Sequence, residues 1–421
     1  MKTSFYCIPI EDGNRTILFD SMSKSFIQLR TDRFKEIYSN SMFLLNKLSE
    51  EEKTLLIKNG FLLEDSIDQQ AVIITGKHHA RLQKNSYHMI INPTLDCNLS
   101  CWYCYESHIA NSRLNDELVE AICKHIEFKH KEDSIKFLHL SFFGGEPLLQ
   151  FELIKKIIEY NEQNKYSYNY IINTNGINVN DSLIDLCKQK NILLNISLDG
   201  TLKSNSKNRF VEETFNLVEN NIKAVKNKGI EFIINYVITP NNIEYINESL
   251  KYFIKNGFMD ICFMINYDAF WTKKDIKLIK EQLEKSIPIM LKVIDGDFIK
   301  IYPIYNKINC IIEEKRETKC NFGKDSIAVS CDGKKYPCIS FIYDNNYEII
   351  HEDQIFTNIC DIEKCKDCEY KDICNNNCMC RFCYHNKKSE VDVNCECEKI
   401  FIEIARKIVN KILNHELNEK V

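Results

Sequence analysis

The stretch Asn92-Pro93-Thr94-Leu95-Asp96-Cys97-Asn98-Leu99-Ser100-Cys101-Trp102-Tyr103-Cys104-Tyr105 decides the fold. Its three cysteines have the spacing Cys-x3-Cys-x2-Cys and follow the apolar run 87–91, which predicts a short buried strand. We therefore expect the cysteines on a loop at the carboxyl end of that strand. Thiolates this close together suit a soft metal or an iron–sulfur cluster. Three thiolates leave one iron of a [4Fe–4S] cluster open to a small molecule.

Two alternatives for this loop are a zinc site and a disulfide-bonded loop. A structural zinc site usually has four ligands, which come as two closely spaced pairs in the sequence. Disulfides belong to oxidising compartments, and the opening Met1-Lys2-Thr3-Ser4-Phe5-Tyr6 lacks the long apolar segment of a secretory signal. The sequence therefore favours the iron–sulfur interpretation.

The composition indicates a cytoplasmic protein of two or three domains. The 421 residues are 27% charged and 44% hydrophobic, and no run of 18 apolar residues occurs, so we expect no membrane span. A net charge of -5 with both signs interspersed gives a nucleic-acid partner no electrostatic support. Twenty cysteines in such a chain indicate metal binding, not a disulfide framework.

The cysteine loop resembles the hallmark of the radical SAM superfamily, in which an aromatic residue, here Tyr103, precedes the last cysteine. The resemblance implies that Cys97, Cys101 and Cys104 bind a [4Fe–4S] cluster. It also implies that the open iron chelates the amino and carboxylate groups of S-adenosylmethionine (SAM). Reduction would then release a 5′-deoxyadenosyl radical.

From residue 87 onward, strand and helix patterns alternate. Apolar strands are predicted at 87–91, 137–143, 168–173, 192–198, 232–238 and 261–265, with helical segments such as 118–128, 153–160, 182–188 and 215–226 between them. This order predicts an α/β fold with a parallel sheet. The resemblance makes residues 87–309 an open, partial (β/α)6 TIM barrel. In such barrels, sites form at the carboxyl ends of the strands.

Polar motifs do follow the predicted strands. Gly144-Gly145-Glu146-Pro147 comes after the second strand; its glycines let backbone approach a ligand, and its acid can accept from a cation. The resemblance implies that this motif binds the SAM amino group and that Asn175 lies near the adenosyl group. It further implies that Ser197 bonds the ribose or carboxylate and that Arg209 pairs with the carboxylate.

Two of the candidate residues, Asp199 and Val237, each allow two interpretations. Asp199 resembles a residue that faces substrate at the barrel mouth, but it could equally cap the helix after Thr201. Val237 is a candidate adenine neighbour or a core residue. The single cysteines Cys7, Cys123, Cys187 and Cys262 are predicted to be small buried hydrophobic residues.

Residues 1–86 are predicted to form a small separate domain. Strand patterns at 5–10 and 16–19 flank the turn signal Asp12-Gly13-Asn14, and two helical segments and a strand at 61–63 follow. This order resembles the winged-helix-like peptide-recognition domain of maturases of ribosomally made peptides. The resemblance implies that a precursor leader adds a strand to the hairpin edge. The alternative is an elaboration that only covers the barrel edge.

Residues 310–421 form a cysteine-rich module, since thirteen of the twenty cysteines lie between Cys310 and Cys397. Their spacing resembles the SPASM domain, although a zinc ribbon shares the Cys-x2-Cys pairs. The resemblance implies two auxiliary [4Fe–4S] clusters. The first would be bound by Cys320, Cys338 and Cys378, and the second by Cys365, Cys368, Cys374 and Cys395.

The module holds more cysteines than this pattern requires. Cys331 is a candidate fourth ligand of the first auxiliary cluster, and Cys397 competes with Cys395. Cys380 and Cys383 have no assigned place. After Lys399, the apolar periodicity predicts a terminal helix packed on the body.

The sequence therefore predicts a radical SAM/SPASM maturase that crosslinks a ribosomally made precursor peptide (a RiPP) by a thioether, carbon–carbon or ether bond. Epimerisation is also compatible. We expect a flavodoxin- or ferredoxin-type reductant, and we identify no general base. The alternatives are an anaerobic sulfatase-maturing enzyme, which makes formylglycine, and a non-catalytic iron–sulfur electron-transfer protein.

Overall fold

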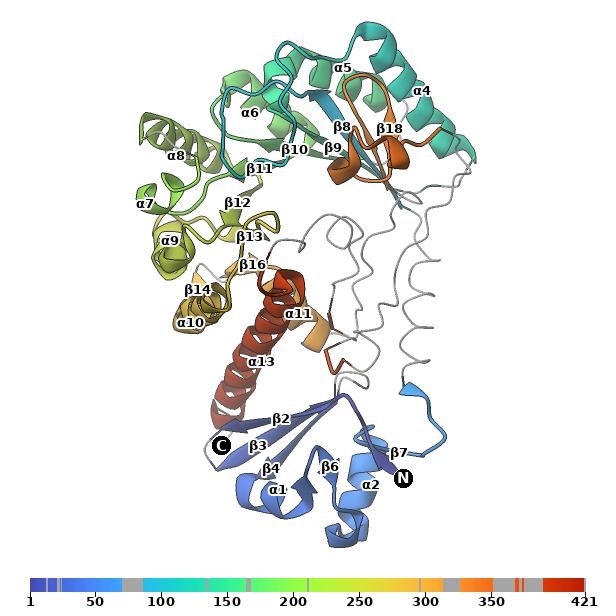
Figure 1. The fold of residues 1–421 in the computed structure, drawn as a ribbon, viewed down its shortest axis with the longest axis vertical. Helices are drawn as coiled ribbons and strands as arrows, with labels where there is room; N and C mark the ends of the chain where they lie inside the picture. The colour runs from blue at the N-terminus through green and yellow to red at the C-terminus, as the bar shows by residue number, and fades with distance from the viewer. Residues whose placement is uncertain are drawn as a thin grey trace.

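The computed structural model describes residues 1–12, 14–20, 23, 25–69, 86–132, 135, 137–163, 168–209, 212–294, 297–312, 326–350, 368–370, 373–374 and 389–419. A nine-stranded sheet in the order β16-β13-β12-β11-β10-β9-β8-β17-β18 dominates the fold (Figure 1). None of the helices in these ranges is both long and apolar enough to cross a membrane.

Six neighbouring parallel strands confirm the predicted α/β order. They are β8 (Ser86–Thr94), β9 (Phe137–Gly144), β10 (Tyr168–Thr174), β11 (Leu193–Ser197), β12 (Phe232–Ile238) and β13 (Asp260–Ile265). The helices α4 (Asp116–Glu132), α5 (Phe151–Glu162), α6 (Asp181–Lys190), α8 (Glu212–Asn227) and α9 (Ile246–Lys255) lie between them along the chain and on the outer side of the sheet (Figure 1).

The alternation of the strands explains this layering. On β9, Leu138, Leu140 and Phe142 are fully buried in the main core, because they point toward the helices. The other face of the sheet is more polar. It carries His88, His139, Ser141, Asn173 and Asn195, joined by the pairs His88–Ser141 and Asn195–Asn173. The inner face of the barrel therefore carries side chains that can form hydrogen bonds.

Three later strands extend the sheet at both edges. β16 (Lys300–Tyr302) runs parallel to β13, β17 (Ser326–Val329) runs parallel to β8, and β18 (Lys335–Tyr336) pairs antiparallel with β17. Because β17 and β18 belong to the predicted cysteine-rich module, one sheet spans the predicted boundary at residue 310. The sequence did not indicate these short strands.

The amino-terminal region has its own small sheet. β2 (Cys7–Asp12), β3 (Arg15–Asp20) and β4 (Ser25–Arg30) form an antiparallel meander, in which β2 and β3 match the predicted hairpin and β4 was not predicted. Next come α1 (Thr31–Ile37), β5 (Tyr38–Ser39), β6 (Met42–Phe43), α2 (Glu50–Lys58) and β7 (Leu62–Leu63), which pairs with β1 (Lys2–Thr3).

The two faces of this meander pack on different partners. Leu18 belongs to a core with residues of α1 and α2 such as Phe34 and Leu56, whereas Phe19 belongs to the main core of the molecule. Ser49 and Glu52 form a reciprocal capping box that fixes the start of α2. The meander is therefore attached to the body through one face and to its own helices through the other.

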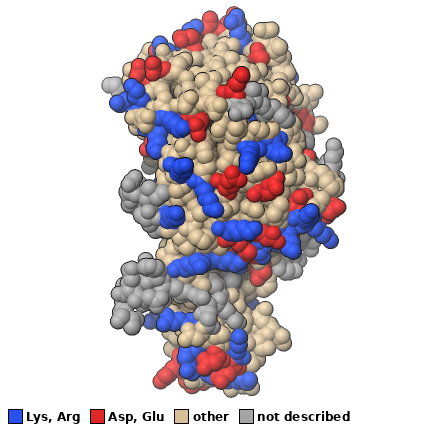
Figure 2. Space-filling model, turned by 90° about the vertical axis from the view of Figure 1, so that its left-hand side faces the viewer, with Lys and Arg blue, Asp and Glu red and all other residues tan. Residues whose placement is uncertain are grey.

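A long terminal helix, α13 (Val393–Glu419), joins the parts of the molecule. It packs against α10 (Lys273–Met290) and α11 (Ile304–Ile312) and ends beside the meander (Figure 1). The predicted terminal helix after Lys399 is present and begins earlier, so Cys395 and Cys397 lie in its first turns. On the face shown in Figure 2, basic and acidic side chains are intermixed.

Candidate functional site

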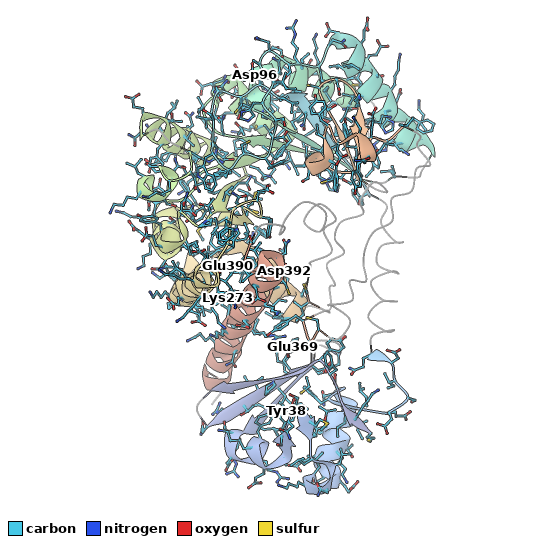
Figure 3. The ribbon with its side chains drawn as sticks, viewed as in Figure 1. Tyr38, Asp96, Lys273, Glu369, Glu390 and Asp392 are labelled. Carbon is cyan, nitrogen blue, oxygen red and sulfur yellow. The ribbon has the colours of Figure 1, made fainter. Side chains whose placement is uncertain are left out.

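The cysteine loop follows β8, as predicted, and hydrogen bonds fold it back on that strand. Ile109 N donates to Leu95 O (3.1 Å), and Leu114 N donates to Pro93 O (2.9 Å). The Asp96 carboxylate, labelled in Figure 3, accepts from the backbone N of Cys97 and of Asn111, both at 2.9 Å. Asp96 thus closes the loop directly before the first thiol. The sequence analysis did not single it out, although an acid beside the first cysteine was visible.

The three thiols of the loop lie close enough to influence one another. Cys97 and Cys101 are half-buried and Cys104 is exposed. The pKa of the Cys104 thiol is raised to about 11, mainly by burial and also by the charges of Cys101, Glu106 and Cys97. The Nδ2 atom of Asn175 lies 3.9 Å from Cys97 Sγ.

This donor set fits an iron–sulfur cluster. A [4Fe–4S] cluster takes each thiolate on a different iron, so its sulfur ligands must be neighbours without converging on one point. Three thiols on one loop are the type and number of donors that such a cluster takes from the chain when one iron stays open.

The motif Gly144-Gly145-Glu146-Pro147 packs against the cysteine loop. Gly145 N donates to Thr94 O (3.1 Å), and Glu146 N donates to Asp96 O (2.8 Å). A Cβ atom on Gly144 or Gly145 would stand 2.2 Å from the carbonyl oxygen of Thr94 or Asp96, respectively. The glycines thus allow close contact between two backbone segments, whereas the sequence predicted that they allow close contact with a ligand. Their contact with SAM stays a prediction.

The Glu146 side chain connects this motif to the next strand. It is fully buried and accepts from Thr174 Oγ1 (2.7 Å), Asn175 N (2.7 Å) and Leu148 N (3.1 Å). Burial raises the pKa of Glu146 to about 7, although these hydrogen bonds oppose the shift. One carboxylate therefore holds the ends of β9 and β10 together.

Asn175 then links β10 to the cysteine loop. Its Nδ2 donates to Asn98 Oδ1 at 2.7 Å, next to the contact with Cys97. Asn175, Ser197 and Arg209 line one small cavity together with Leu99 of the cysteine loop. The structure therefore brings together three predicted SAM-binding residues that are far apart in the sequence.

Asp199 and Arg209 form a buried ion pair beneath Tyr103. Arg209 Nε lies 3.3 Å from Asp199 Oδ2, which also accepts from Tyr103 OH at 2.9 Å. Burial opposes the charge of Arg209, but Tyr103, Asp199 and Cys101 outweigh it and hold the pKa of the guanidinium above its usual range. Arg209 is therefore a fixed cation beside the cysteine loop.

The capping interpretation of Asp199 is wrong. Thr201 is the N-cap of α7 (Leu202–Asn205), because its side chain accepts from Ser204 N. Asp199 is fully buried, and its Oδ1 accepts from Val237 N at 2.9 Å. Val237 is half-buried at the end of β12 and does not belong to the core, so the core interpretation of Val237 is not supported.

Asn208 is a residue of this site that the sequence analysis missed. It is fully buried, its Nδ2 donates to Val237 O (3.2 Å), and its Oδ1 accepts from Thr239 Oγ1 (2.9 Å). The indole of Trp102 lies 3.3 Å from the same Oδ1. Asn208 therefore joins the cysteine loop to the end of β12, and only its position beside Arg209 hinted at this.

Some cysteines of the carboxyl-terminal region are described. Cys331 lies in the connection between β17 and β18, and Cys338 follows β18. Cys368 and Cys374 are half-buried, and Cys374 N donates to Tyr370 O at 2.7 Å. Cys320, Cys365, Cys378, Cys380 and Cys383 lie outside the described residues.

Cys395 and Cys397 differ in their surroundings. Cys397 is fully buried in the main core, whereas Cys395 is half-buried and accompanies Cys368 in raising the pKa of Lys399 against the effect of burial. Among the single cysteines, Cys7, Cys123 and Cys187 are buried as predicted; the prediction for Cys262 is wrong, since this half-buried residue lies on the inner face of β13.

The fold is an α/β partial barrel with a loop of three thiols at the carboxyl end of its first parallel strand. The Radical SAM superfamily model matches residues 91–253. An uncharacterized protein of Methanocaldococcus jannaschii is 34% identical over 238 residues, which are 52% of this chain and 73% of that protein. The chain belongs to the radical SAM superfamily and is an enzyme whose cofactors are a [4Fe–4S] cluster and SAM.

Other similar proteins include a sulfatase-maturating enzyme and proteins whose structures contain a bound peptide. A cysteine-type anaerobic sulfatase-maturating enzyme of Clostridium novyi is 26% identical over 76% of this chain and 95% of that enzyme. The solved structure of anSMEcpe with bound AdoMet and a peptide has a TM-score of 0.64 and 23% identity, covering 78% of this chain and 99% of that one. SuiB of Streptococcus suis bound to its precursor peptide SuiA has a TM-score of 0.51 and 16% identity, covering 90% and 96%.

We predict that Gly145→Ala destabilises the protein by more than about 3 kcal/mol, because the new Cβ displaces the Asp96 carbonyl. Gly229→Ala is the matched control: it imposes a φ of +69° on alanine but meets no atom within 4 Å, so about 1 kcal/mol is expected. Anaerobic denaturant unfolding checks both. Equal losses would show that the close backbone contact is unimportant.

We predict that Asp199→Asn costs about 3 kcal/mol, because it leaves the buried charge of Arg209 without its counter-ion. Tyr103→Phe removes one hydrogen bond to the same carboxylate and should cost about 1 kcal/mol. The same unfolding measurement compares them. A larger loss in Tyr103→Phe would contradict the ion pair as the dominant interaction.

Proposed function

We propose that this enzyme is a maturase that introduces a crosslink into a ribosomally made precursor peptide. The observation that carries the proposal is the combination of the radical SAM barrel with a separate amino-terminal meander-and-helix unit. The likeness to SuiB, whose structure contains a precursor peptide, extends over 90% of the chain, against 78% for anSMEcpe. These comparisons support a peptide substrate and the extra recognition unit.

The site residues would bind and orient the cofactors. Cys97, Cys101 and Cys104 would hold the cluster, and Arg209 would hold the SAM carboxylate from a position fixed by Asp199 and Tyr103. When bound, the cluster and SAM supply a 5′-deoxyadenosyl radical that abstracts a hydrogen atom. Glu146 and Asn175 would keep the surrounding loops in place. The chain thus supplies alignment and exclusion of water.

The inner face of the barrel would receive the peptide side chain that reacts. Its polar groups, including the His88–Ser141 pair at 2.8 Å, offer hydrogen bonds to peptide groups that leave water. Burial lowers the pKa of His88 to about 4, and the charge of His139 acts in the same direction. This histidine would therefore be neutral at physiological pH and could accept or donate a hydrogen bond.

The amino-terminal unit would bind the leader of the precursor. Its meander has β2 and β4 as edge strands, and an extended peptide can add to such an edge through main-chain hydrogen bonds.

The carboxyl-terminal cysteines would hold two auxiliary clusters that accept the electron left on the substrate. Cys320, Cys338, Cys378 and Cys331 are assigned to the first and Cys365, Cys368, Cys374 and Cys395 to the second. A flavodoxin- or ferredoxin-type protein would supply reducing electrons.

A sulfatase-maturing activity is the second candidate. It is favoured by 26% identity over 95% of the Clostridium novyi enzyme and by the higher TM-score of anSMEcpe. In this case the substrate would be a cysteine or serine that becomes formylglycine, and the amino-terminal unit would have no evident use. The electron-transfer alternative is not retained, because the superfamily is one of enzymes.

The test is an anaerobic incubation of reconstituted, dithionite-reduced enzyme with SAM and the precursor peptide encoded beside its gene. Mass spectrometry should show 5′-deoxyadenosine and a peptide lighter by two hydrogens, and Cys101→Ala should abolish both. A sulfatase peptide is tested in parallel. Conversion of its cysteine to an aldehyde, with the precursor unchanged, would establish the second candidate instead.

We further predict that a precursor without its leader is modified about 100-fold more slowly at low peptide concentration. Binding of the leader raises the effective concentration of the attached core peptide at the active site. The full-length enzyme is used in both reactions, and turnover is followed by mass spectrometry. Equal rates for both peptides would contradict leader recognition.

A further inference from the structure

The middle of α13 carries a buried cation that the proposed chemistry does not use. Arg406 is only 8% exposed. Its helix neighbours Ile402, Ala405 and Val409 belong to the main core, so this side of α13 faces the interior. The guanidinium lies over the ring of Tyr370, 4.8 Å from the ring centroid. A charged group therefore stands where the helix buries apolar side chains.

Two nitrogens of this guanidinium are buried without a hydrogen-bond acceptor. They are Nε and Nη2 of Arg406, and no atom of the described chain accepts from either. The two nitrogens lie on the same edge of the planar group and point their hydrogens in parallel directions. That edge is the one that can bind both oxygens of a carboxylate. The contact with Tyr370 satisfies neither nitrogen.

Two carboxylates near Arg406 do not pair with it. Glu403 lies one helical turn earlier, but its Oε2 is 2.6 Å from Nζ of Lys280 and its Oε1 accepts from Tyr370 OH at 3.4 Å. Glu369 acts on Arg406 through its charge, without accepting from the two nitrogens. Burial lowers the pKa of Arg406 in spite of these neighbours. Because buried donors without acceptors cost free energy, this edge favours an anionic ligand.

The edge of Arg406 lies near the amino-terminal unit. Burial raises the pKa of Tyr38, which belongs to β5 of that unit, and the charge of Glu369 contributes to the shift. Glu369 therefore acts on groups of both parts of the molecule. Figure 3 shows Glu369 beside α13 and above the unit that carries Tyr38. A peptide held by the amino-terminal unit would thus pass close to Arg406.

We propose that the edge of Arg406 formed by Nε and Nη2 binds a carboxylate of the precursor peptide. This inference rests on the proposed function, because it takes the precursor as the ligand. Both nitrogens are covered in this structure, so binding requires that the contacts around them open. The carboxylate then gains two charge-assisted hydrogen bonds, and the buried cation gains a counter-ion.

The first test compares melting temperatures of the reconstituted enzyme without peptide, under anaerobic conditions. Arg406→Met removes a buried cation that lacks a counter-ion, so the melting temperature should rise by about 2 °C. The matched control is Lys407→Met, which removes the same charge from the next side chain, an exposed one that pairs with Glu284. It should change the melting temperature by less than about 1 °C. A lower melting temperature for Arg406→Met would overturn the inference, because it would make Arg406 a structural contact of Tyr370.

The second test measures binding of fluorescently labelled precursor to the full-length enzyme by anisotropy, without SAM so that no turnover occurs. Arg406→Met should weaken binding about 30-fold, because a charge-assisted bidentate contact is lost. Arg406→Lys should weaken it about 10-fold, since lysine keeps the charge but not the paired donors. Lys407→Met should bind as tightly as the unaltered enzyme. Equal affinities for all four proteins would overturn the inference.

Variants of the peptide identify the source of the carboxylate. Each Asp and Glu of the precursor is changed in turn to Asn or Gln, and a peptide with an amidated carboxyl terminus is tested beside them. One of these changes should weaken binding as much as Arg406→Met does and should have no further effect in that variant. If every change acts equally on the unaltered enzyme and on Arg406→Met, the inference is wrong and the maturase proposal stands. If the unaltered enzyme does not bind the precursor, the proposed function fails together with the inference.

Discussion

The candidate site depends on the contact between the backbone of Gly144-Gly145 and the carbonyl oxygens of Thr94 and Asp96. This contact leaves no room for a side chain, so it brings the end of β9 directly against the start of the cysteine loop. Glu146 extends the connection to β10 through Thr174 and Asn175, and Asn175 returns it to Cys97. Three strand ends and one thiol therefore form a closed series of contacts, in which displacement of any member disturbs the others.

Two charged side chains, Arg209 and Asp199, lie next to this series of contacts. Arg209 lies beside the cysteine loop, Asp199 fixes it from below, and Tyr103 of the loop itself contacts both, with the guanidinium 5.6 Å from its ring. The loop that is assigned to the cluster thus also helps to hold the cation assigned to the SAM carboxylate. Such coupling suits a site where two cofactors must meet in one orientation.

A second buried ion pair, between Lys307 and Glu398, lies far along the chain and has a similar form. Both pairs place a cation next to a segment with predicted cluster ligands and balance it with a carboxylate. The helix α13 connects this second region with the amino-terminal meander, since it packs on α10 and α11 and ends beside β2 and β3 (Figure 1). One continuous helix thus runs from a segment with predicted cluster ligands to the amino-terminal meander.

The sequence by itself determined the parallel α/β order and the position of the cysteine loop after β8, because strand periodicity and motif spacing are local properties. The grouping of Asn175, Ser197 and Arg209 was implied only by the family resemblance, and the structure places the three along one cavity. Only the tertiary structure decided that Asp199 pairs with Arg209 and does not cap α7, that Asp96 and Asn208 support the loop, and that Cys262 faces the barrel interior. It also showed that β17 and β18 extend the barrel sheet. These features depend on contacts between residues distant in sequence, and no local pattern encodes which buried carboxylate or amide meets which partner.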